Sequence, residues 1–498
     1  MSIPGGVGTE RGTSIELLGH IGRYLPSSVV PAFLGLLFTA VFTRTFTAAQ
    51  FGRFSLAMSA ATLLASLAGQ WLQQGITRFL PAAQSPEAAE ELRGAVALGL
   101  AWVSAIILAV GAVACAWAWW QTRPAWGALS MAGVAAALVL AHLAILAAML
   151  QASMRAGRYT VYRLAEAAAR FGLSLLLVFA LWRDETSLVL AQVFSVGLLL
   201  PLLRRDAGAP SYRVLAAQWR RYQPGLRRLA SYGLPMVGWY LAAMLLDMGD
   251  RYIIQFFRGS QEVGIYSASY GLVYGAAGLL TAPILLAAHP FLMRAWGQGG
   301  GPEASRWLGT IAEWFAIMGM VLTAGLWVLA RDVGRFLLGA EFRQGFVIMP
   351  IILGGLVAWQ LGMYTHKPLE FREKTRLMLA AGLCAAGANI ALNVLLVPRF
   401  GYLAAAWTTL ACYVLYAATT YWLGRRELPW RLDVWRLARF AAVTIAVTAV
   451  AAIAAPVLER WAGYAAGLVF KVGLVGAFAA FSTWRLLLGA QGMGGASR

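Results

Sequence analysis

The feature that most constrains this chain is a succession of long apolar segments separated by short polar ones. Hydrophobic residues make up 60% of the 498 residues and charged residues only 12%, whereas a soluble globular chain carries about 25% charged residues. So few charges cannot cover the surface of a water-soluble protein of this size. We therefore predict an integral membrane protein that crosses the bilayer many times.

The apolar segments are long enough to cross a membrane as helices. A hydrocarbon core about 30 Å thick requires about 20 apolar residues per helix. We predict fourteen spans, at residues 25–46, 54–80, 95–120, 126–150, 164–182, 186–203, 230–257, 264–292, 307–330, 345–366, 377–397, 402–423, 437–456 and 463–488. The predicted fold class is therefore all-α, with about 14 transmembrane helices.

The distribution of basic residues predicts the orientation. Cytoplasmic segments of membrane proteins are enriched in Lys and Arg. With a cytoplasmic N-terminus, the predicted inner segments hold 28 of the 40 basic residues and the outer segments hold 10. This bias predicts that both termini are cytoplasmic. It also accounts for the net charge of +19 without a nucleic-acid partner, and we expect none.

A short repeat divides the chain into two halves. Residues 49–57 (AQFGRFSLA) and 261–269 (QEVGIYSAS) share a glycine, an aromatic residue and a serine at the same three positions, at an offset of 212. Both stretches follow the first span of a group of six. Such parallel repeats are typical of transporters built from two similar bundles. We predict an N-terminal six-helix bundle at 1–203, a basic cytoplasmic linker at 204–229, a C-terminal six-helix bundle at 230–426 and two accessory transmembrane helices at 427–498.

Three motifs then resemble one known family. Residues 389–406 read N-x-x-x-N, an apolar run, P-x-x-G and small residues. Residues 44–55 resemble the family's first helix connection, and residues 231–235, followed by 250–251 and 263–267, resemble the opening of its second half. The family is the Wzx-type lipid-linked oligosaccharide flippases, the polysaccharide transporter branch of the MOP exporter superfamily, which also contains the MATE antiporters. The resemblance covers about residues 25–425.

The resemblance implies both a fold and a function. It implies two six-helix bundles around a central cavity, with alternating access. The implied function is to flip undecaprenyl-diphosphate-linked oligosaccharide to the outer leaflet of the bacterial inner membrane, for O-antigen, capsule or exopolysaccharide synthesis. The expected partners are this substrate, membrane lipids, and a glycan polymerase and chain-length regulator of the same pathway. We expect no cofactor, but coupling to H⁺ or Na⁺.

Two alternatives remain open. A MATE-like drug or cation antiporter would have the same two bundles. A membrane glycan polymerase or transferase would need a large outer loop or paired catalytic groups. The predicted outer loops are short, and no catalytic pattern stands out among 21 acidic residues and four histidines. We therefore expect a transporter and not an enzyme. The three cysteines lie far apart in apolar segments, so we predict no metal site.

The seventh predicted span contains the most informative charges. Charged residues inside a membrane are costly and therefore need an explanation. Asp247, Asp250 and Arg251 fall on one helical face. One interpretation is a structural pair between Asp247 and Arg251. The other is a cavity in which Asp247 and Asp250 couple transport to an ion while Arg251 binds diphosphate, which suits the planar guanidinium group.

Other residues are candidates for binding the substrate. Arg44 and Arg78 end the first two spans, and Lys367 lies at the expected cytoplasmic mouth. Asn389 and Asn393 stand one helical turn apart and could bind sugar hydroxyl groups. Each has a plainer explanation: a basic side chain that reaches the membrane interface, or an amide that joins two helices.

Three prolines are candidates for gating. Pro235, Pro283 and Pro350 fall within the seventh, eighth and tenth predicted spans. A proline inside a membrane helix frees a backbone carbonyl and allows a bend. The equally good alternative is local adjustment of helix packing.

The predicted topology can be tested with reporter fusions. A C-terminal reporter that is active only in the cytoplasm should be active, because an even number of spans returns the chain to the side on which it began. A C-terminal reporter that is active only outside the membrane should be silent. The reverse pattern would contradict the fourteen-span assignment.

Overall fold

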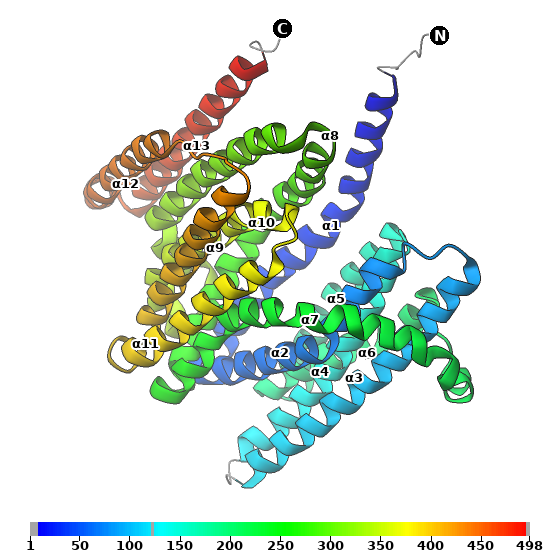
Figure 1. Cartoon of the computed structure of the whole chain (residues 1–498). Helices are drawn as coiled ribbons and strands as arrows, with labels where there is room; N and C mark the ends of the chain where they lie inside the picture. Colours follow the sequence, from blue (N-terminus) through cyan, green and yellow to red (C-terminus); the bar gives the residue numbers. More distant parts are fainter. Residues whose placement is uncertain (1–7, 121–123, 495–498) are drawn as a thin grey trace, which may run out of the picture. The chain divides into compact units, whose positions relative to one another are not determined.

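The structure is a computed structural model that describes residues 8–120 and 124–494. Every regular element among these residues is a helix, as the sequence predicted (Figure 1). The first six α-helices and the π-helical turn η1 are α1 (Gly8–Thr45), α2 (Ala48–Phe79), α3 (Pro86–Trp120), α4 (Pro124–Ala152), α5 (Ala156–Leu176), η1 (Leu177–Leu181) and α6 (Glu185–Asp206). The remaining elements, with the 3₁₀ helix η2, are α7 (Tyr212–Arg258), α8 (Ser260–Leu337), η2 (Ala340–Ile348), α9 (Met349–Thr365), α10 (Lys367–Phe371), α11 (Thr375–Glu427), α12 (Val434–Ala462) and α13 (Tyr464–Gly494).

Three of these helices contain a break. The backbone leaves the helical conformation at Gln218 in α7, at Gly300 in α8 and at Gly401 in α11. Both glycines have a positive φ, 68° at Gly300 and 59° at Gly401, which residues with a Cβ atom rarely adopt. Helices α8 and α11 are therefore each two helices joined by a single glycine.

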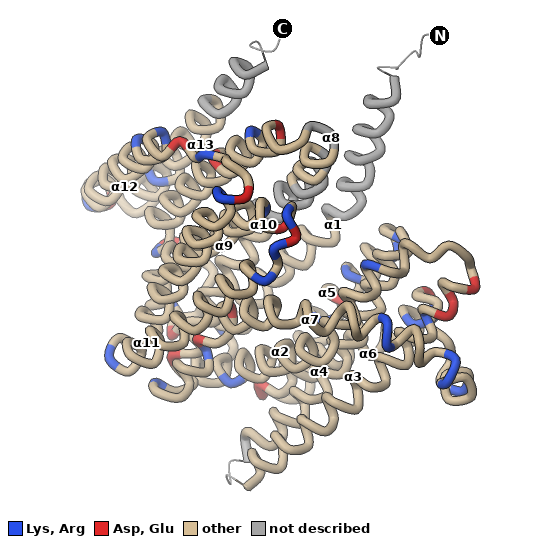
Figure 2. Tube along the Cα trace, viewed as in Figure 1, with Lys and Arg blue, Asp and Glu red and all other residues tan. Residues whose placement is uncertain are grey.

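The number of membrane spans agrees with the expectation of about 14. Twelve helices within the described residues are long and apolar enough to cross a bilayer. Helix α11 counts once among them, although its two parts on either side of Gly401 hold two predicted spans. The predicted span 264–292 lies in α8, where many side chains fall outside the described set. Long uncharged stretches with charges near their ends are visible in Figure 2. The chain is a multi-pass membrane protein.

The chain forms two compact units. Unit 1 comprises Met1–Phe38 and Gln50–Met244, and unit 2 comprises Thr39–Ala49 and Leu245–Arg498. The core of unit 1 contains fully buried aliphatic residues of α2, α3 and α4, among them Leu72, Val103 and Ile145. The division falls inside α7. The predicted bundle and linker limits at 203, 230 and 426 stay a prediction.

The sequence repeat opens equivalent helices. Helix α2 begins at Ala48 and α8 at Ser260, which are separated by the same offset as the repeat. In unit 1, Arg53 near the start of α2 forms an ion pair with Glu185, the first residue of α6, at 2.5 Å. In unit 2, Glu262 near the start of α8 accepts a hydrogen bond of 3.0 Å from the backbone N–H of Tyr402, at the start of the second part of α11. Each unit thus joins the corresponding helix ends.

Buried charges connect the two C-terminal helices to α8. Lys471 of α13 donates to Asp332 of α8 at 3.0 Å and to Glu459 of α12 at 2.7 Å. Tyr464, which opens α13, donates to the other oxygen of Asp332 at 2.9 Å. Because Asp332 is only 3% exposed, these bonds compensate a carboxylate that would otherwise be costly to bury.

The break at Gly401 provides a stability test. We expect Gly401→Ala to lower the free energy of unfolding by about 1–3 kcal/mol, because a backbone of this kind strains any residue other than glycine. A Cβ atom there would also overlap Glu262. The measurement is thermal unfolding of the purified protein in detergent. Gly387→Ala is the control: it lies in the same helix with open space around it and should unfold no earlier than the wild type.

Candidate functional site

The candidate site is a buried polar cluster in unit 2, where α7, α8 and α11 meet. At its centre is Asp250 of α7, whose side chain is 0% exposed. One carboxylate oxygen accepts the backbone N–H of Arg251 at 2.9 Å. The other accepts hydroxyl groups from Tyr266 of α8 and, at 3.3 Å, from Thr409 of α11. Three neighbours therefore replace the water that a charged carboxylate requires.

Arg251 lies beside this carboxylate and is 8% exposed. Its Nη1 atom is 3.7 Å from Oδ1 of Asp250 and donates a hydrogen bond of 2.6 Å to the backbone carbonyl of Asp247. The guanidinium carbon lies 4.7 Å from the ring centre of Tyr270, a cation–π arrangement. The guanidinium carbon also lies 5.8 Å from the ring centre of Tyr266, so the positive charge is held by one carboxylate, one carbonyl and two aromatic faces.

The side-chain pair between Asp247 and Arg251, one of the two interpretations drawn from the sequence, is replaced by a different pairing. Arg251 forms its ion pair with Asp250, and the carboxylate of Asp247 accepts the hydroxyl group of Tyr270 at 2.5 Å. The helical spacing did place Asp247 and Arg251 one turn apart, but the guanidinium group turns to the backbone carbonyl of that turn. The partner of Asp247 then comes from α8, which helical spacing cannot identify.

The two asparagines extend the cluster through α11. Asn393 donates to Asn389 at 3.1 Å, and Asn389 donates to Thr409 at 3.4 Å. Thr408 donates to Asn393 at 2.7 Å. Both amides are fully buried and join the two parts of α11, which matches the expectation of helix-joining hydrogen bonds. Through Thr409 the same chain of bonds reaches Asp250.

Aromatic side chains line up beside the charges. Tyr266, Tyr270 and Tyr274 of α8 follow one another at every fourth residue, with ring centres 5.8 and 6.1 Å apart. The ring centres of Trp359 in α9 and Tyr413 in α11 are 5.1 Å apart. These residues were not among the candidates from the sequence, although the regular spacing of the three tyrosines was visible there.

Lys367 occupies a second polar cluster in the same unit. It is only 6% exposed, and its Nζ atom donates to Glu370 at 2.5 Å. The neighbouring His366 shares a hydrogen bond of 3.0 Å with the hydroxyl group of Tyr416 in α11. Glu370 was not among the sequence candidates, although it lies one turn after Lys367. An incoming phosphate group would have to replace this carboxylate.

Arg44 lies at another place in unit 2. Its side chain is exposed and donates to the backbone carbonyls of Ala40 at 2.8 Å and of Phe336, in the last turn of α8, at 2.5 Å. Two further bonds join the same segments: Gly339 N–H to the Thr43 hydroxyl group, and Ala48 N–H to the Glu341 carboxylate. Arg44 therefore caps a helix end in this structure.

In unit 1, Arg78 is exposed in the last turn of α2.

A family model described as "Polysaccharide biosynthesis protein" matches residues 21–296, more than half of the chain. The chain belongs to this family. No curated protein matches it in sequence.

Solved structures place this family member in a known fold. It is similar to the lipid II flippase MurJ in an inward closed conformation, with a TM-score of 0.71, 13% identity, and coverage of 93% of this chain and 98% of that one. A multidrug resistance MATE family transporter of the MOP superfamily, in an inward-facing conformation, follows with a TM-score of 0.60, 13% identity, and coverage of 83% and 95%. A mutant of the Vibrio cholerae MATE transporter VcmN has a TM-score of 0.54 and 15% identity, with coverage of 84% of this chain and 97% of that one. The predicted MOP-type fold is confirmed.

The three proline candidates have different positions in the structure. Pro235 lies within a stretch of α7 that stays helical. Pro350 lies in the first turn of α9, where its missing N–H costs no hydrogen bond, so it begins a helix and does not interrupt one. The side chain of Pro283 lies outside the described residues. A gating role for all three stays a prediction.

The described residues also contain no group of three or more His, Cys, Asp and Glu side chains that could hold a metal ion.

The buried ion pair provides a third prediction. We expect Arg251→Gln to lower the free energy of unfolding by about 3–5 kcal/mol, because it leaves Asp250 buried without a charged partner. Adding Asp250→Asn should recover part of that loss, since a neutral amide needs no counter-charge. The measurement is a double-mutant cycle by thermal unfolding in detergent. Arg399→Gln removes an exposed arginine of α11 as a control, and an equal effect of Arg251→Gln and Arg399→Gln would contradict the prediction.

Proposed function

We propose that this protein flips undecaprenyl-diphosphate-linked oligosaccharide from the cytoplasmic to the outer leaflet of the bacterial inner membrane by alternating access. The product would serve O-antigen, capsule or exopolysaccharide synthesis. The observation that carries the proposal is the buried Asp250–Arg251 cluster in a member of the polysaccharide biosynthesis protein family. The likeness in fold to a lipid II flippase supports it.

The basic groups of unit 2 suit the head of such a substrate. A diphosphate needs charge-assisted donors, and the guanidinium group of Arg251 offers two N–H groups in one plane. Lys367 forms an ion pair with the carboxylate of Glu370. A diphosphate could replace this carboxylate at the ammonium group, so Lys367 can act as a first contact that exchanges partners.

The cluster also suggests how an ion gradient could drive transport. When H⁺ or Na⁺ neutralises Asp250, Arg251 loses its ion-pair partner and becomes available to the diphosphate. The hydroxyl oxygen of Thr409 lies beside Asp250 and provides a further oxygen ligand of the kind that hard cations prefer. Because coupling between two sites is reciprocal, the bound diphosphate would in turn favour the cation on Asp250.

One observation favours a second candidate, a MATE-like drug or cation antiporter. The rings of Tyr270 and Tyr274 stack with 6.1 Å between their centres, and aromatic faces attract organic cations. An enzyme, such as a glycan polymerase or transferase, is the least favoured alternative. The family and the fold suggest a transporter, and we propose that the protein is not an enzyme.

We further propose a protein with both termini in the cytoplasm and without a cofactor. A glycan polymerase and a chain-length regulator of the same pathway would receive the flipped product.

The fourth prediction tests transport and coupling together. The protein is reconstituted into proteoliposomes with a fluorescent diphosphate-polyprenyl oligosaccharide, and an external lectin reports the sugar. Wild-type protein should expose the sugar faster when an H⁺ or Na⁺ gradient is imposed. Asp250→Asn should still flip the lipid, but the flipping rate should be the same with and without the gradient, because the asparagine side chain is permanently neutral.

Asp184→Asn is the matched control for this experiment. Asp184 is exposed and caps α6 by accepting the N–H of Thr186 at 3.1 Å, and asparagine caps a helix equally well. The control should keep the response to the gradient. An undiminished response in Asp250→Asn would reject the coupling role. Efflux of a cationic dye without movement of the lipid would favour the antiporter.

A further inference from the structure

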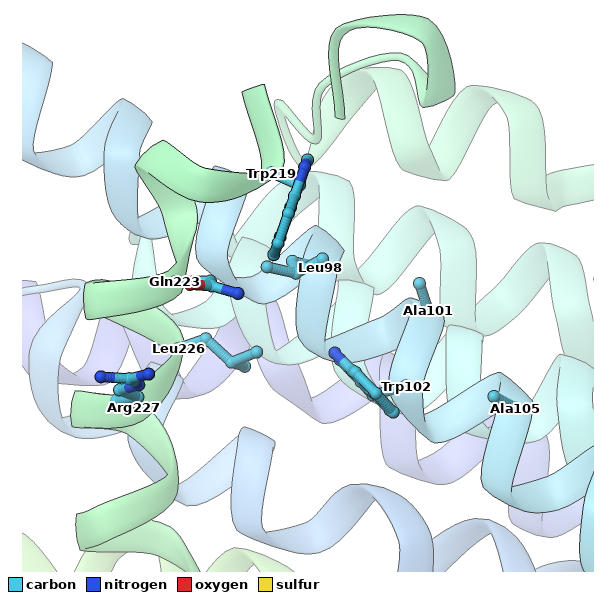
Figure 3. A pocket seen from close by; sticks show the side chains of 8 residues that line it. All are labelled: Leu98, Ala101, Trp102, Ala105, Trp219, Gln223, Leu226 and Arg227. Atoms are coloured by element: carbon cyan, nitrogen blue, oxygen red, sulfur yellow. The ribbon is translucent and has the colours of Figure 1, made fainter. Parts of the chain in front are cut away.

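An open groove lies in unit 1 between α3 and the part of α7 that directly follows the break at Gln218. Its volume is about 490 Å³. Four residues from each helix line it: Leu98, Ala101, Trp102 and Ala105 of α3, and Trp219, Gln223, Leu226 and Arg227 of α7 (Figure 3). On each helix these positions follow the helical repeat and form one stripe. The lining is apolar except at Gln223 and Arg227.

Close packing holds the two helices beside this groove. Gly94 of α3 leaves room for the ring of Tyr222, since a Cβ atom there would overlap it. Tyr222 is 2% exposed. One turn further on α7, a Cβ atom at Gly225 would lie 2.9 Å from Ala95 of α3. The groove is therefore bounded by an ordered helix contact.

The groove lies near one end of the apolar part of α3. The first turn of α3 is polar and includes Glu87, and the buried apolar segment begins near Gly94. At about 1.5 Å per residue, the groove-lining residues of α3 lie about 6–17 Å further along the helix. In a hydrocarbon core about 30 Å thick, this range runs from near one edge to about the middle, among the acyl chains. Trp102 and Trp219 are 60% and 43% exposed along it.

A basic side chain without a protein partner stands at the rim. Arg227 is exposed, and among the described residues it has no hydrogen bond, ion pair or ring contact. Its neighbours differ: the guanidinium group of Arg228 lies 4.4 Å from the ring centre of Phe79, and that of Arg220 lies 5.6 Å from Trp219. Arg227 is thus available to an anion at the end of an apolar groove.

We propose that this groove binds one acyl chain of an anionic glycerophospholipid of the cytoplasmic leaflet, with Arg227 at the lipid phosphate. The groove volume of about 490 Å³ is of the order that one fatty acyl chain fills, since a methylene group takes up about as much space as a water molecule, about 30 Å³. The choice of the cytoplasmic leaflet rests on the proposed orientation, but lipid binding itself does not depend on transport.

The test uses delipidated full-length protein in detergent and phosphatidylglycerol with a photoreactive group on its acyl chain. Crosslinked peptides should map to residues 98–105 and 219–227. A matched phosphatidylcholine probe should label these peptides about five-fold less, the effect of one basic residue on an anionic lipid. Arg227→Gln should lower phosphatidylglycerol labelling to that level. Ala101→Phe should abolish labelling by both probes, because the larger side chain fills the groove.

Two controls match these changes. Arg221→Gln removes an exposed arginine of α7 outside the groove, and Ala109→Phe enlarges an exposed residue further along α3; both should label like the wild type. Equal labelling by the two lipids would overturn the proposal, as would an equal loss in Arg221→Gln. Displacement of the probe by an equimolar polyprenyl diphosphate would overturn it too, by assigning the groove to the substrate. Labelling needs no flipping, so it can fail or succeed independently of transport.

Discussion

The burial of Asp250 and Arg251 is the constraint on which much of unit 2 depends. Two opposite charges in a membrane protein are stable only when nearby groups replace the lost water. Helix α8 provides the hydroxyl group of Tyr266 and the ring of Tyr270, and α11 provides the hydroxyl group of Thr409. Each of these contacts fixes one helix against α7. The same dependence makes the cluster responsive, since neutralising the carboxylate changes what the guanidinium group can bind.

A single glycine allows α11 to contribute side chains to this cluster from both of its parts. At Gly401 the backbone of α11 reverses, so Asn389 before the break and Thr409 after it bond to one another. The reversal is possible because glycine has no Cβ atom. Glu262 binds the first free backbone N–H after the break, at Tyr402, and so satisfies a helix end that would otherwise lack a partner. A carboxylate and a glycine thus form one helix connection.

Much of the fold could be predicted from the sequence because it depends on local properties. The length of the apolar segments determines how many helices cross the membrane, and the spacing of Asn389 and Asn393 places both amides on one face. The first residues of α2 and α8 follow from a repeat that is visible in nine residues. The charge candidates Asp250 and Arg251 were identified because any charge inside an apolar segment stands out. These inferences need only neighbours along the chain.

The partners of these groups were decided by the tertiary structure alone. Tyr266 and Thr409 are 16 and 159 residues from Asp250 in the sequence, and no helical spacing connects them. The groove beside α3 depends in the same way on tertiary packing, because Tyr222 of α7 packs against Gly94 of α3 and holds the two helices together. The sequence by itself therefore determined a multi-pass helical membrane protein with charges in its seventh span. The tertiary structure decided which side chains compensate those charges. A buried charge needs nearby polar groups, and the packing of distant helices determines which groups are near.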